Sequence, residues 1–448
     1  MTRRALIKWS VAAGAALGVS RAKVFEILEK TAGKSVAQAA SENPTTRSVH
    51  ICAGNGALAW FTLFWPQVDI AKANNPNFAW HQQGKQMDVA GTTNPLVIGP
   101  DTPWQALKPE QQVTAFLCGQ NETHNNQPKS TAMLNGANIF AVASALQSAS
   151  PSVIPVVTIG DQSVGTAAGQ AAVSNVGNAD GIVGLFNSAA SRAGGLLSNM
   201  NDATTYKTYY DAFSQLNRAR TSSTVQTSYN TAAGAATFLG TNLAAKLAVT
   251  PDDLTRYGVN GGTRASLTAV ARTLIITAKA FQLGLTNSVV FPAFRDDPHN
   301  AFDGGDVNTV PAAMKKVFDG FMDDLTKYTD SASGQSLKDD TVISVHGDTY
   351  KNSRNKAGWG DGTDGNTNVV FVYGAGHLYS GWNGSVDRNG KVLGYGADGK
   401  PAPYDPAATA KFATASIAYA IAKRDERLIQ TFANGTTIGG VFGPLKAV

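Results

Sequence analysis

The sequence of 448 residues contains few charged residues and few cysteines. Asp, Glu, Lys and Arg make up 15% of it, and the Gly- and Ala-rich composition lacks the charged blocks that are expected of disordered tails. The two cysteines, Cys52 and Cys118, are compatible with one disulfide or with two buried thiols, because the sequence fixes no distance between them. No segment repeats at a fixed period, which excludes a repeat architecture.

Several signatures of catalysis are also missing. There is no Walker motif and no dinucleotide-binding fingerprint, so neither kind of phosphate-binding loop is predicted. The segment Asp161-Gln162-Ser163-Val164-Gly165 lacks the first glycine of a nucleophile elbow. The sequence therefore disfavours a covalent serine hydrolase.

The positive charge of the chain is concentrated at its N-terminus. The whole chain carries a formal net charge of +5, and residues 1–40 contain seven Lys or Arg against two Glu. This segment alone accounts for the net charge, so residues 41–448 are formally neutral. Because no stripe of basic residues with interleaved aromatics remains, we expect no nucleic-acid partner.

Residues 1–40 have the pattern of a twin-arginine export leader. Thr2-Arg3-Arg4-Ala5-Leu6-Ile7-Lys8 precedes an apolar run at 9–19, and Ala37-Gln38-Ala39 offers a small-residue cleavage site. The run is shorter than the about 20 apolar residues that a spanning helix needs, so we expect no transmembrane helix in the mature chain. The pattern predicts passage through the twin-arginine translocation machinery to the periplasm, the cell surface or the medium, with the leader either cleaved or retained.

Runs of β-branched residues alternate with amphipathic stretches in the rest of the chain. We expect strands at 153–159, 288–291, 341–345 and 368–373. We expect helices at 267–281, 310–328 and 406–423. Thr263 and Thr309 are the predicted caps of the first two helices, and Gly284 stops the first. This alternation predicts an α/β fold, a three-layer sandwich with a mainly parallel sheet.

Residues 41–448 are expected to form a single domain. From about 160 to 260 the composition shifts to Ala, Ser, Gly and Asn, with helical stretches around 206–221 and no persuasive strand. We interpret this range as a helical insertion on the main sheet. Because active sites of α/β sheets lie at the carboxyl ends of the strands, the residues that follow the predicted strands are the candidates for chemistry.

Two pairs of Asp and His follow predicted strands. Asp297 and His299 come after the strand at 288–291, and His346 and Asp348 come at the end of the strand at 341–345. An Asp and a His two residues apart on an extended segment can point to the same side, and a carboxylate with an imidazole suits Zn, Mn or Fe. If folding brings the pairs together, they predict one or two divalent ions.

Two further histidines are candidates for completing the metal shell. His377 lies just past the strand at 368–373, and His124 lies in Asn121-Glu122-Thr123-His124-Asn125. His50 and His81 have no carboxylate nearby and are interpreted as ordinary residues. The loops at 359–366 and 387–390 are dense in Asp, Asn and Gly and could wrap Ca²⁺, but ordinary turn chemistry explains them as well.

These motifs resemble a known family. Asp297-Pro298-His299 resembles the Trp-Asp-Thr-His element of the twin-arginine-exported proteins called domain of unknown function 1501, which are grouped with the alkaline phosphatase and sulfatase superfamily. The segment 342–352 resembles that family's strand with Glu-Phe-Gly-Arg, and 368–376, 381–390 and 407–422 resemble its closing strand, glycine turn and last helix. The resemblance covers mostly 254–423, with a fainter echo at 121–128.

The resemblance implies an alkaline-phosphatase-like fold and metal-dependent hydrolysis of phosphate or sulfate esters. The chain departs from the family pattern at Val345 and Asp348, which replace the Glu and Arg, and at Gly365-Asn366-Thr367, which replaces Asp-His-Trp. Two hypotheses follow. The chain is an exported metalloprotein that uses Zn, Mn, Fe or Ca, or it is a catalytically inactive binding or surface-assembly protein that retains the fold.

Overall fold

The computed structural model describes residues 45–68, 85–87, 95–120, 125–127, 133–134, 136–150, 152–190, 238, 242–297, 306–330, 334–349, 367–387 and 391–433. Several predicted features lie outside this part of the chain. They are the export leader at 1–40, the helical stretch at 206–221, the loop at 359–366, His124 and His299.

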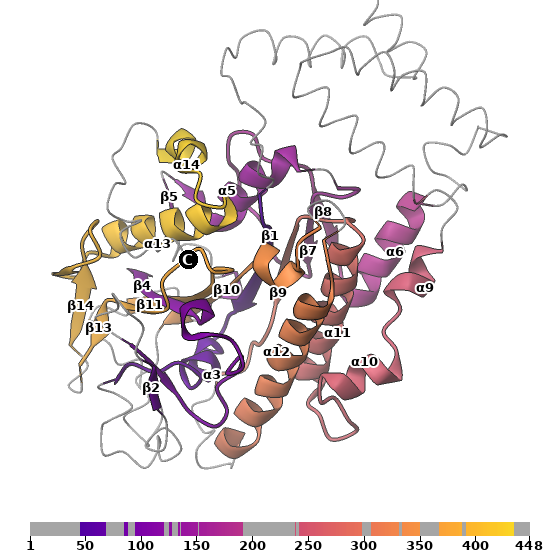
Figure 1. The fold of residues 1–448 in the computed structure, drawn as a ribbon, viewed down its shortest axis with the longest axis horizontal. Coiled ribbons are helices and arrows are strands. Elements are labelled where there is room, and N and C mark those ends of the chain that lie inside the picture. Colours follow the sequence, from indigo (N-terminus) through magenta and orange to yellow (C-terminus); the bar gives the residue numbers. More distant parts are fainter. Residues whose placement is uncertain are drawn as a thin grey trace, which may run out of the picture.

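An eight-stranded sheet forms the centre of the protein, in the order β12-β4-β11-β10-β1-β9-β7-β8 (Figure 1). The strands are β1 (Arg47–Ala53), β4 (Thr114–Gln120), β7 (Val156–Ile159), β8 (Val173–Val176), β9 (Ser288–Pro292), β10 (Thr341–Thr349), β11 (Thr367–Tyr373) and β12 (Gly381–Asn383). All of them run in one direction except β11, which is antiparallel to β10 and β4. The predicted α/β fold with a mainly parallel sheet is confirmed.

The central strands are buried on both faces, and alternate residues belong to two separate hydrophobic clusters. In β10, Ile343 and Val345 pack into one cluster and Val342 packs into the other. In β11, Phe371 and Val370 divide in the same way. Near-continuous apolar strands are typical of sheets that are covered by helices on both faces.

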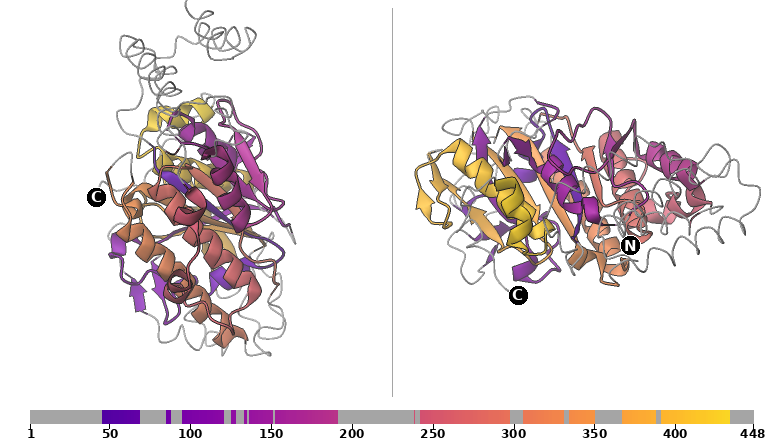
Figure 2. Two further views of the ribbon diagram at one scale, coloured as in Figure 1. Left: turned by 90° about the vertical axis from the view of Figure 1, so that its right-hand side faces the viewer. Right: turned by 90° about the horizontal axis from the view of Figure 1, so that it is seen from above.

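The helices cover both faces of the sheet. The first face carries α5 (Ile139–Leu146) and α13 (Pro406–Ile421), whose buried residues join the cluster of Val342 and Val370. The second face carries α3 (Leu58–Thr62), α6 (Ala179–Ala190), α9 (Leu243–Leu247), α11 (Ala265–Gln282) and α12 (Val310–Lys327). Seen from above, α13 and α11 lie on opposite sides of the strands (Figure 2). The layers are helix, sheet and helix.

The predicted helices are present, and one of the two predicted caps is confirmed. Thr309 is the N-cap of α12 although its side chain makes no capping hydrogen bond, whereas Arg264 rather than Thr263 is the N-cap of α11. Helix α13 is capped by Asp405, whose carboxylate accepts from the amides of Ala407 and Ala408. Gly284 follows α11 with φ of +68°, in the left-handed region that favours glycine.

The range from 160 to 260 contributes a strand to the main sheet. Strand β8 pairs in parallel with β7 and forms one edge of the sheet, whereas the sequence predicted no strand there. Its four residues, Val-Ser-Asn-Val, contain no apolar run, so their pattern is too short to distinguish a strand from a loop. Helices α6, α9 and α10 (Pro251–Arg256) lie in the same range and agree with its predicted helical character.

The remaining elements are small. Short sheets are formed by β2 (Lys85–Met87) with β3 (Leu96–Ile98), by β5 (Met133–Leu134) with β6 (Ala137–Asn138), and by β13 (Ser385–Val386), β14 (Val392–Tyr395) and β15 (Pro401–Ala402). Helix α14 (Glu426–Ala433) follows α13. Within the described ranges, no helix has the length and apolarity needed to cross a membrane.

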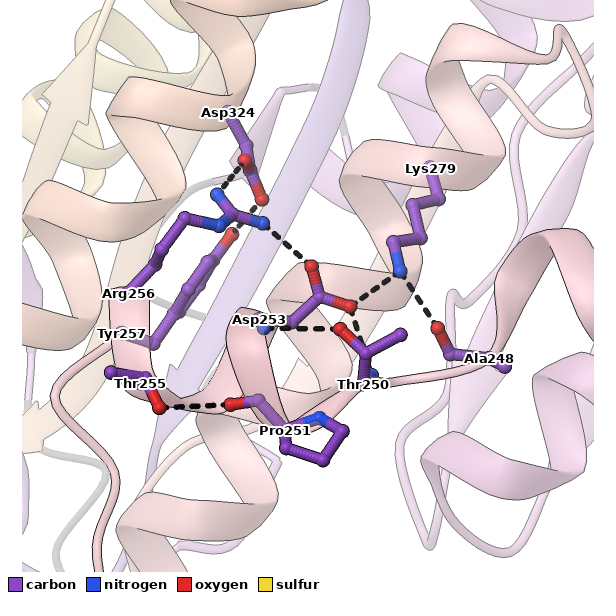
Figure 3. Close-up of polar contacts among 9 residues, drawn as sticks. All are labelled: Ala248, Thr250, Pro251, Asp253, Thr255, Arg256, Tyr257, Lys279 and Asp324. Atoms are coloured by element: carbon purple, nitrogen blue, oxygen red, sulfur yellow. Dashed lines mark hydrogen bonds and ion pairs between the residues drawn. The ribbon is translucent and has the colours of Figure 1, made fainter.

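A network of charged side chains fixes α10 against α11 and α12 (Figure 3). Asp253 forms a capping box with Thr250 and accepts hydrogen bonds from Lys279 at 2.6 Å and Arg256 at 2.6 Å. Arg256 also pairs with Asp324, which accepts from the Tyr257 hydroxyl at 2.9 Å. Burial alone would raise the pKa of Asp253, but the bonds from Lys279, Thr250 and Arg256 outweigh it and lower that pKa overall.

Cys52 and Cys118 are buried and are not joined by a disulfide. Cys52 lies on β1 and Cys118 on β4, with β10 and β11 between these strands. Three strand spacings amount to about 14 Å, whereas the Cα atoms of a disulfide lie within about 7 Å. Of the two interpretations left open by the sequence, the structure has the two buried thiols.

Candidate functional site

The carboxyl edge of the sheet gathers segments that are far apart in sequence. Strands β1, β4, β7, β9 and β10 are parallel, so all of them end at this edge. The segments at this edge are the turn at 54–57, the loop at 125–127, residues 160–163 and 293–297, and the last three residues of β10, 347–349. Ligands of open α/β sheets usually bind outside this edge.

Gly56 is the point where two of the predicted ligands meet. Its backbone N–H donates to the Asp348 carboxylate, and it has φ of +83°. A Cβ atom added to Gly56 would lie 2.5 Å from Cγ of Asp297, which is closer than real Cβ contacts come. The turn after β1 therefore fits only a glycine at this position, and the side chains of Asp297 and Asp348 both approach it.

The neighbouring acidic residues are engaged in structural contacts. The Trp60 indole donates to the backbone oxygen of Asp296 at 3.1 Å. Arg264 pairs at 2.5 Å with both Asp296 and Asp306, and Arg295 pairs with Asp161. Each of these pairs is partly exposed to solvent, so its contribution to stability is small. The pairs orient the segment that carries Asp297.

Side-chain amides line the other half of the edge. The loop at 125–127 packs against Gly54, where an added Cβ would lie 2.4 Å from the Asn125 oxygen. The Gln162 amide donates to the Asn126 oxygen at 2.8 Å, and the Ser163 hydroxyl donates to Gln127 at 2.9 Å. The Gln162 amide also donates to the Asp161 carboxylate at 3.2 Å, so this half of the edge combines hydrogen-bonding groups with the charged pair of Asp161 and Arg295.

His346 points into the interior instead of toward Gly56. Its ring is fully buried and packs edge-on against Phe140 of α5, with 4.9 Å between ring centroids. The Ser344 hydroxyl lies 2.7 Å from Nε2 of His346 and 2.7 Å from Nδ1 of His50. Two buried histidines are thus bridged by one serine.

The bridge limits the protonation states of the two histidines. A hydroxyl has one hydrogen to donate, so at most one ring accepts from Ser344 and at least one ring donates to it. Burial lowers the pKa of His50 to about 3 and lowers that of His346 well below its ordinary value, which His50 reinforces. Both rings are therefore neutral at physiological pH.

A β-bulge separates the directions of His346 and Asp348. The register between β10 and β11 shifts between His346 and Thr349. An added Cβ on Gly347 would lie 2.2 Å from Cβ of Leu58, so α3 packs directly on the backbone there. The extra residue of the bulge turns Asp348 toward Gly56, whereas His346 keeps the orientation of an interior strand residue.

His377 lies at the opposite edge of the sheet. Its strand, β11, is the antiparallel one, so the turn at 374–377 lies beside the amino ends of β1 and β10. The Arg424 guanidinium donates to the Gly376 oxygen at 2.9 Å in this turn. Burial, together with the charges of Arg424 and Lys423, lowers the pKa of His377 to about 4.

The structure thus brings together two of the six predicted metal ligands, Asp297 and Asp348. His346 lies in the core and His377 at the other edge, while His124 and His299 lie outside the described part of the chain. Within that part, no group of three or more His, Cys, Asp or Glu could hold a metal ion. No local sequence pattern indicates the role of Gly56 or the pairing of His50 with His346, because both depend on strand register.

Comparison with known proteins places no constraint on this site. No protein-family model, no curated protein and no solved structure matches the chain.

Proposed function

We propose that this protein is an exported binding or surface-assembly protein without catalytic activity, built on an alkaline-phosphatase-like fold. The supporting observation is the turn after β1, at the centre of the carboxyl edge. Its residues, Gly54-Asn55-Gly56-Ala57, include no hydroxyl, thiol or carboxylate, and the side chains of Asp297 and Asp348 both approach Gly56. This turn therefore offers a substrate no nucleophile.

The surrounding residues support the same proposal. Asp348 accepts a backbone hydrogen bond from Gly56, and Asp296 and Asp161 pair with Arg264 and Arg295. Through this hydrogen bond and these ion pairs, the acidic groups stabilise the loops at the carboxyl edge of the sheet. The twin-arginine pattern at 2–8 supports export.

A metal-dependent phosphate or sulfate ester hydrolase is the second candidate. It is favoured by the approach of Asp297 and Asp348 to the same glycine. Carboxylate oxygens suit Ca²⁺, Mg²⁺ or Mn²⁺ better than Zn²⁺, whose usual imidazole ligand His346 is engaged with Ser344. Bound there, such an ion would polarise an ester oxygen and lower the pKa of a bound water.

One experiment on the full-length exported chain separates the two candidates. The protein is incubated with Ca²⁺, Mg²⁺, Mn²⁺ or Zn²⁺, its metal content is counted by mass spectrometry, and hydrolysis of p-nitrophenyl phosphate and sulfate is measured. We expect less than about a tenth of an equivalent of metal. We also expect no turnover above that of the double variant Asp297→Asn, Asp348→Asn.

Asp306→Asn is the matched control, because Asp306 is an acidic residue of the same region that pairs with Arg264 and does not approach Gly56. Stoichiometric metal that is lost in the double variant but kept in Asp306→Asn, with ester turnover that follows the metal, would establish the hydrolase and overturn the proposal.

A further inference from the structure

Strands β7 and β9 are parallel neighbours, but the chain leaves them toward opposite faces of the sheet. After β7, Val164 packs into the cluster of α5 and α13 on the first face. After β9, Phe294 and Val310 pack into the cluster of the second face, where α12 lies. Ligands of open α/β sheets usually bind outside the carboxyl ends of two such strands. The residues that follow the two strands, 160–163 and 293–297, are called the switch point below.

One ion pair spans the switch point. Arg295 follows β9 and pairs with Asp161, which follows β7. Their side chains are 40% and 44% exposed, so both charged groups are accessible to solvent. The contact uses one guanidinium nitrogen and Oδ1 of the carboxylate. No other described side chain bonds the remaining N–H groups of Arg295 or Oδ2 of Asp161. The pair therefore presents spare donors beside a spare acceptor.

A buried amide adds a second acceptor. Gln162 is 4% exposed, and its Nε2 donates to the Asn126 oxygen at 2.8 Å and to Oδ1 of Asp161 at 3.2 Å. Both partners are acceptors, so they fix which end of the amide is the nitrogen. Oε1 of Gln162 is buried and accepts no hydrogen bond from any residue that the structure describes. Because a buried acceptor without a donor is costly, a ligand that donates to Oε1 would remove this cost.

Together these groups match the charges of an α-amino acid. Its carboxylate can accept from the spare N–H groups of Arg295, because a guanidinium is a planar set of donors that suits a carboxylate. Its ammonium has three N–H donors and no acceptor, which suits Oδ2 of Asp161 and Oε1 of Gln162. The ligand is neutral overall, as is the pair of Arg295 and Asp161, so all four charges are satisfied without breaking the pair.

A neutral ligand such as a sugar is a poorer match to this arrangement. A sugar carries no charge to complement Arg295 and Asp161. The aromatic side chains Trp60 and Phe294, from the same edge of the sheet, are each 1% exposed. Neither of them presents a ring face on which the apolar face of a sugar could pack.

We propose that the switch point binds the zwitterionic head group of a free α-amino acid. Arg295 donates to the ligand carboxylate, and Asp161 and Gln162 accept from the ligand ammonium. This inference rests on the proposed function and deepens its binding part, because it names the chemical class of the ligand.

Isothermal titration calorimetry of the full-length chain with each of the common L-amino acids tests the proposal. We expect at least one of them to bind with one-to-one stoichiometry. Its N-acetyl amide derivative carries neither charge and should bind about tenfold more weakly or worse. Arg295→Gln and Asp161→Asn should each weaken binding of the amino acid by about tenfold or more, because each removes one charged partner.

Arg427→Gln is the matched control, since it removes a guanidinium from another exposed Arg–Asp pair, in α14. Circular dichroism and thermal melting verify that each variant is folded, as expected when a partly exposed pair is lost. The inference would be overturned if no amino acid bound, if the uncharged derivative or glucose bound as tightly, or if Arg427→Gln weakened binding equally. Ester turnover in a chain that binds an amino acid would overturn only the proposed absence of catalysis, so the two failures are distinguishable.

Discussion

Two polar networks inside this protein accommodate buried titratable side chains in different ways. Beside α10, Asp253 and Asp324 meet Arg256 and Lys279, so buried carboxylates are neutralised by opposite charges (Figure 3). Beneath α5, a buried His–Ser–His bridge contains no charge. An interior accommodates polar groups either by pairing charges or by holding titratable groups in their neutral form.

The two networks also differ in their access to water. The Arg256 side chain is 38% exposed, whereas His50 and His346 are fully buried. The stability of the histidine bridge therefore depends mainly on the apolar side chains packed around it. The stability of the charged network depends more on its ion pairs and hydrogen bonds. Substitutions in the two networks test this difference.

The largest effect is expected from removing the ring that packs against both histidines. Phe140 lies 5.1 Å from His50 and 4.9 Å from His346 between ring centroids. Phe140→Ala leaves a cavity beside polar groups, and we expect a loss of about 3–5 kcal/mol in the free energy of unfolding. Urea denaturation measures this loss, and a change below about 1 kcal/mol would show that packing does not sustain the bridge.

A smaller loss is expected from breaking the charged network. Asp324→Ala removes the acceptor of the Tyr257 hydroxyl and of Arg256, but Arg256 can still reach water and Asp253. We expect a loss of about 2–3 kcal/mol by the same measurement. The exposed Arg427→Ala, which separates the Arg427–Asp425 pair, should leave the free energy of unfolding nearly unchanged. If Asp324→Ala and Arg427→Ala reduced the free energy of unfolding equally, Asp324 would not have the stabilising role assigned to it.

The smallest effect concerns pH, and it distinguishes the neutral network from the charged one. The pKa of His50 is lowered from 6.5 to about 3 in the folded protein, so between these values the unfolded chain binds more protons. Stability must therefore fall as pH decreases below about 6.5, with His50 contributing about 2 kcal/mol of loss near pH 5.

His50→Asn keeps a polar atom near Nδ1 and removes the titration, so its stability should fall less steeply than that of the natural chain. Denaturation midpoints from pH 7 to pH 5 measure the difference, and parallel curves for the two proteins would contradict the assignment. Arg427→Ala serves as the variant whose pH dependence should match the natural chain.

The long elements could be predicted from the sequence because their patterns are local. Helices α11 and α12 carry apolar residues at helical spacing over 18 residues each, and β10 begins with a β-branched run. Strand β8 was missed because four residues without an apolar run carry no usable period. The two-residue spacing of His346 and Asp348 predicted that their side chains point to the same side. This prediction was wrong because the bulge after His346 changes the direction of the following side chains.

The candidate site was predictable only in part, for a related reason. The sequence placed Asp297 and Asp348 after strands, and the parallel sheet brings them to one edge. It could not show that β11 runs antiparallel and carries His377 to the other edge. Strand direction is decided by contacts between distant segments, which the local pattern does not contain.

The fit between Gly56 and Asp297 has a consequence for how this chain can change. Any residue larger than glycine at position 56 collides with the Asp297 side chain and must also adopt an unfavourable backbone conformation. A single substitution that introduces a reactive side chain at position 56 therefore destabilises the turn, whatever the reactivity of that side chain. New chemistry at the centre of the edge requires coupled changes at both positions, so the two residues are expected to show strong epistasis in a library of variants.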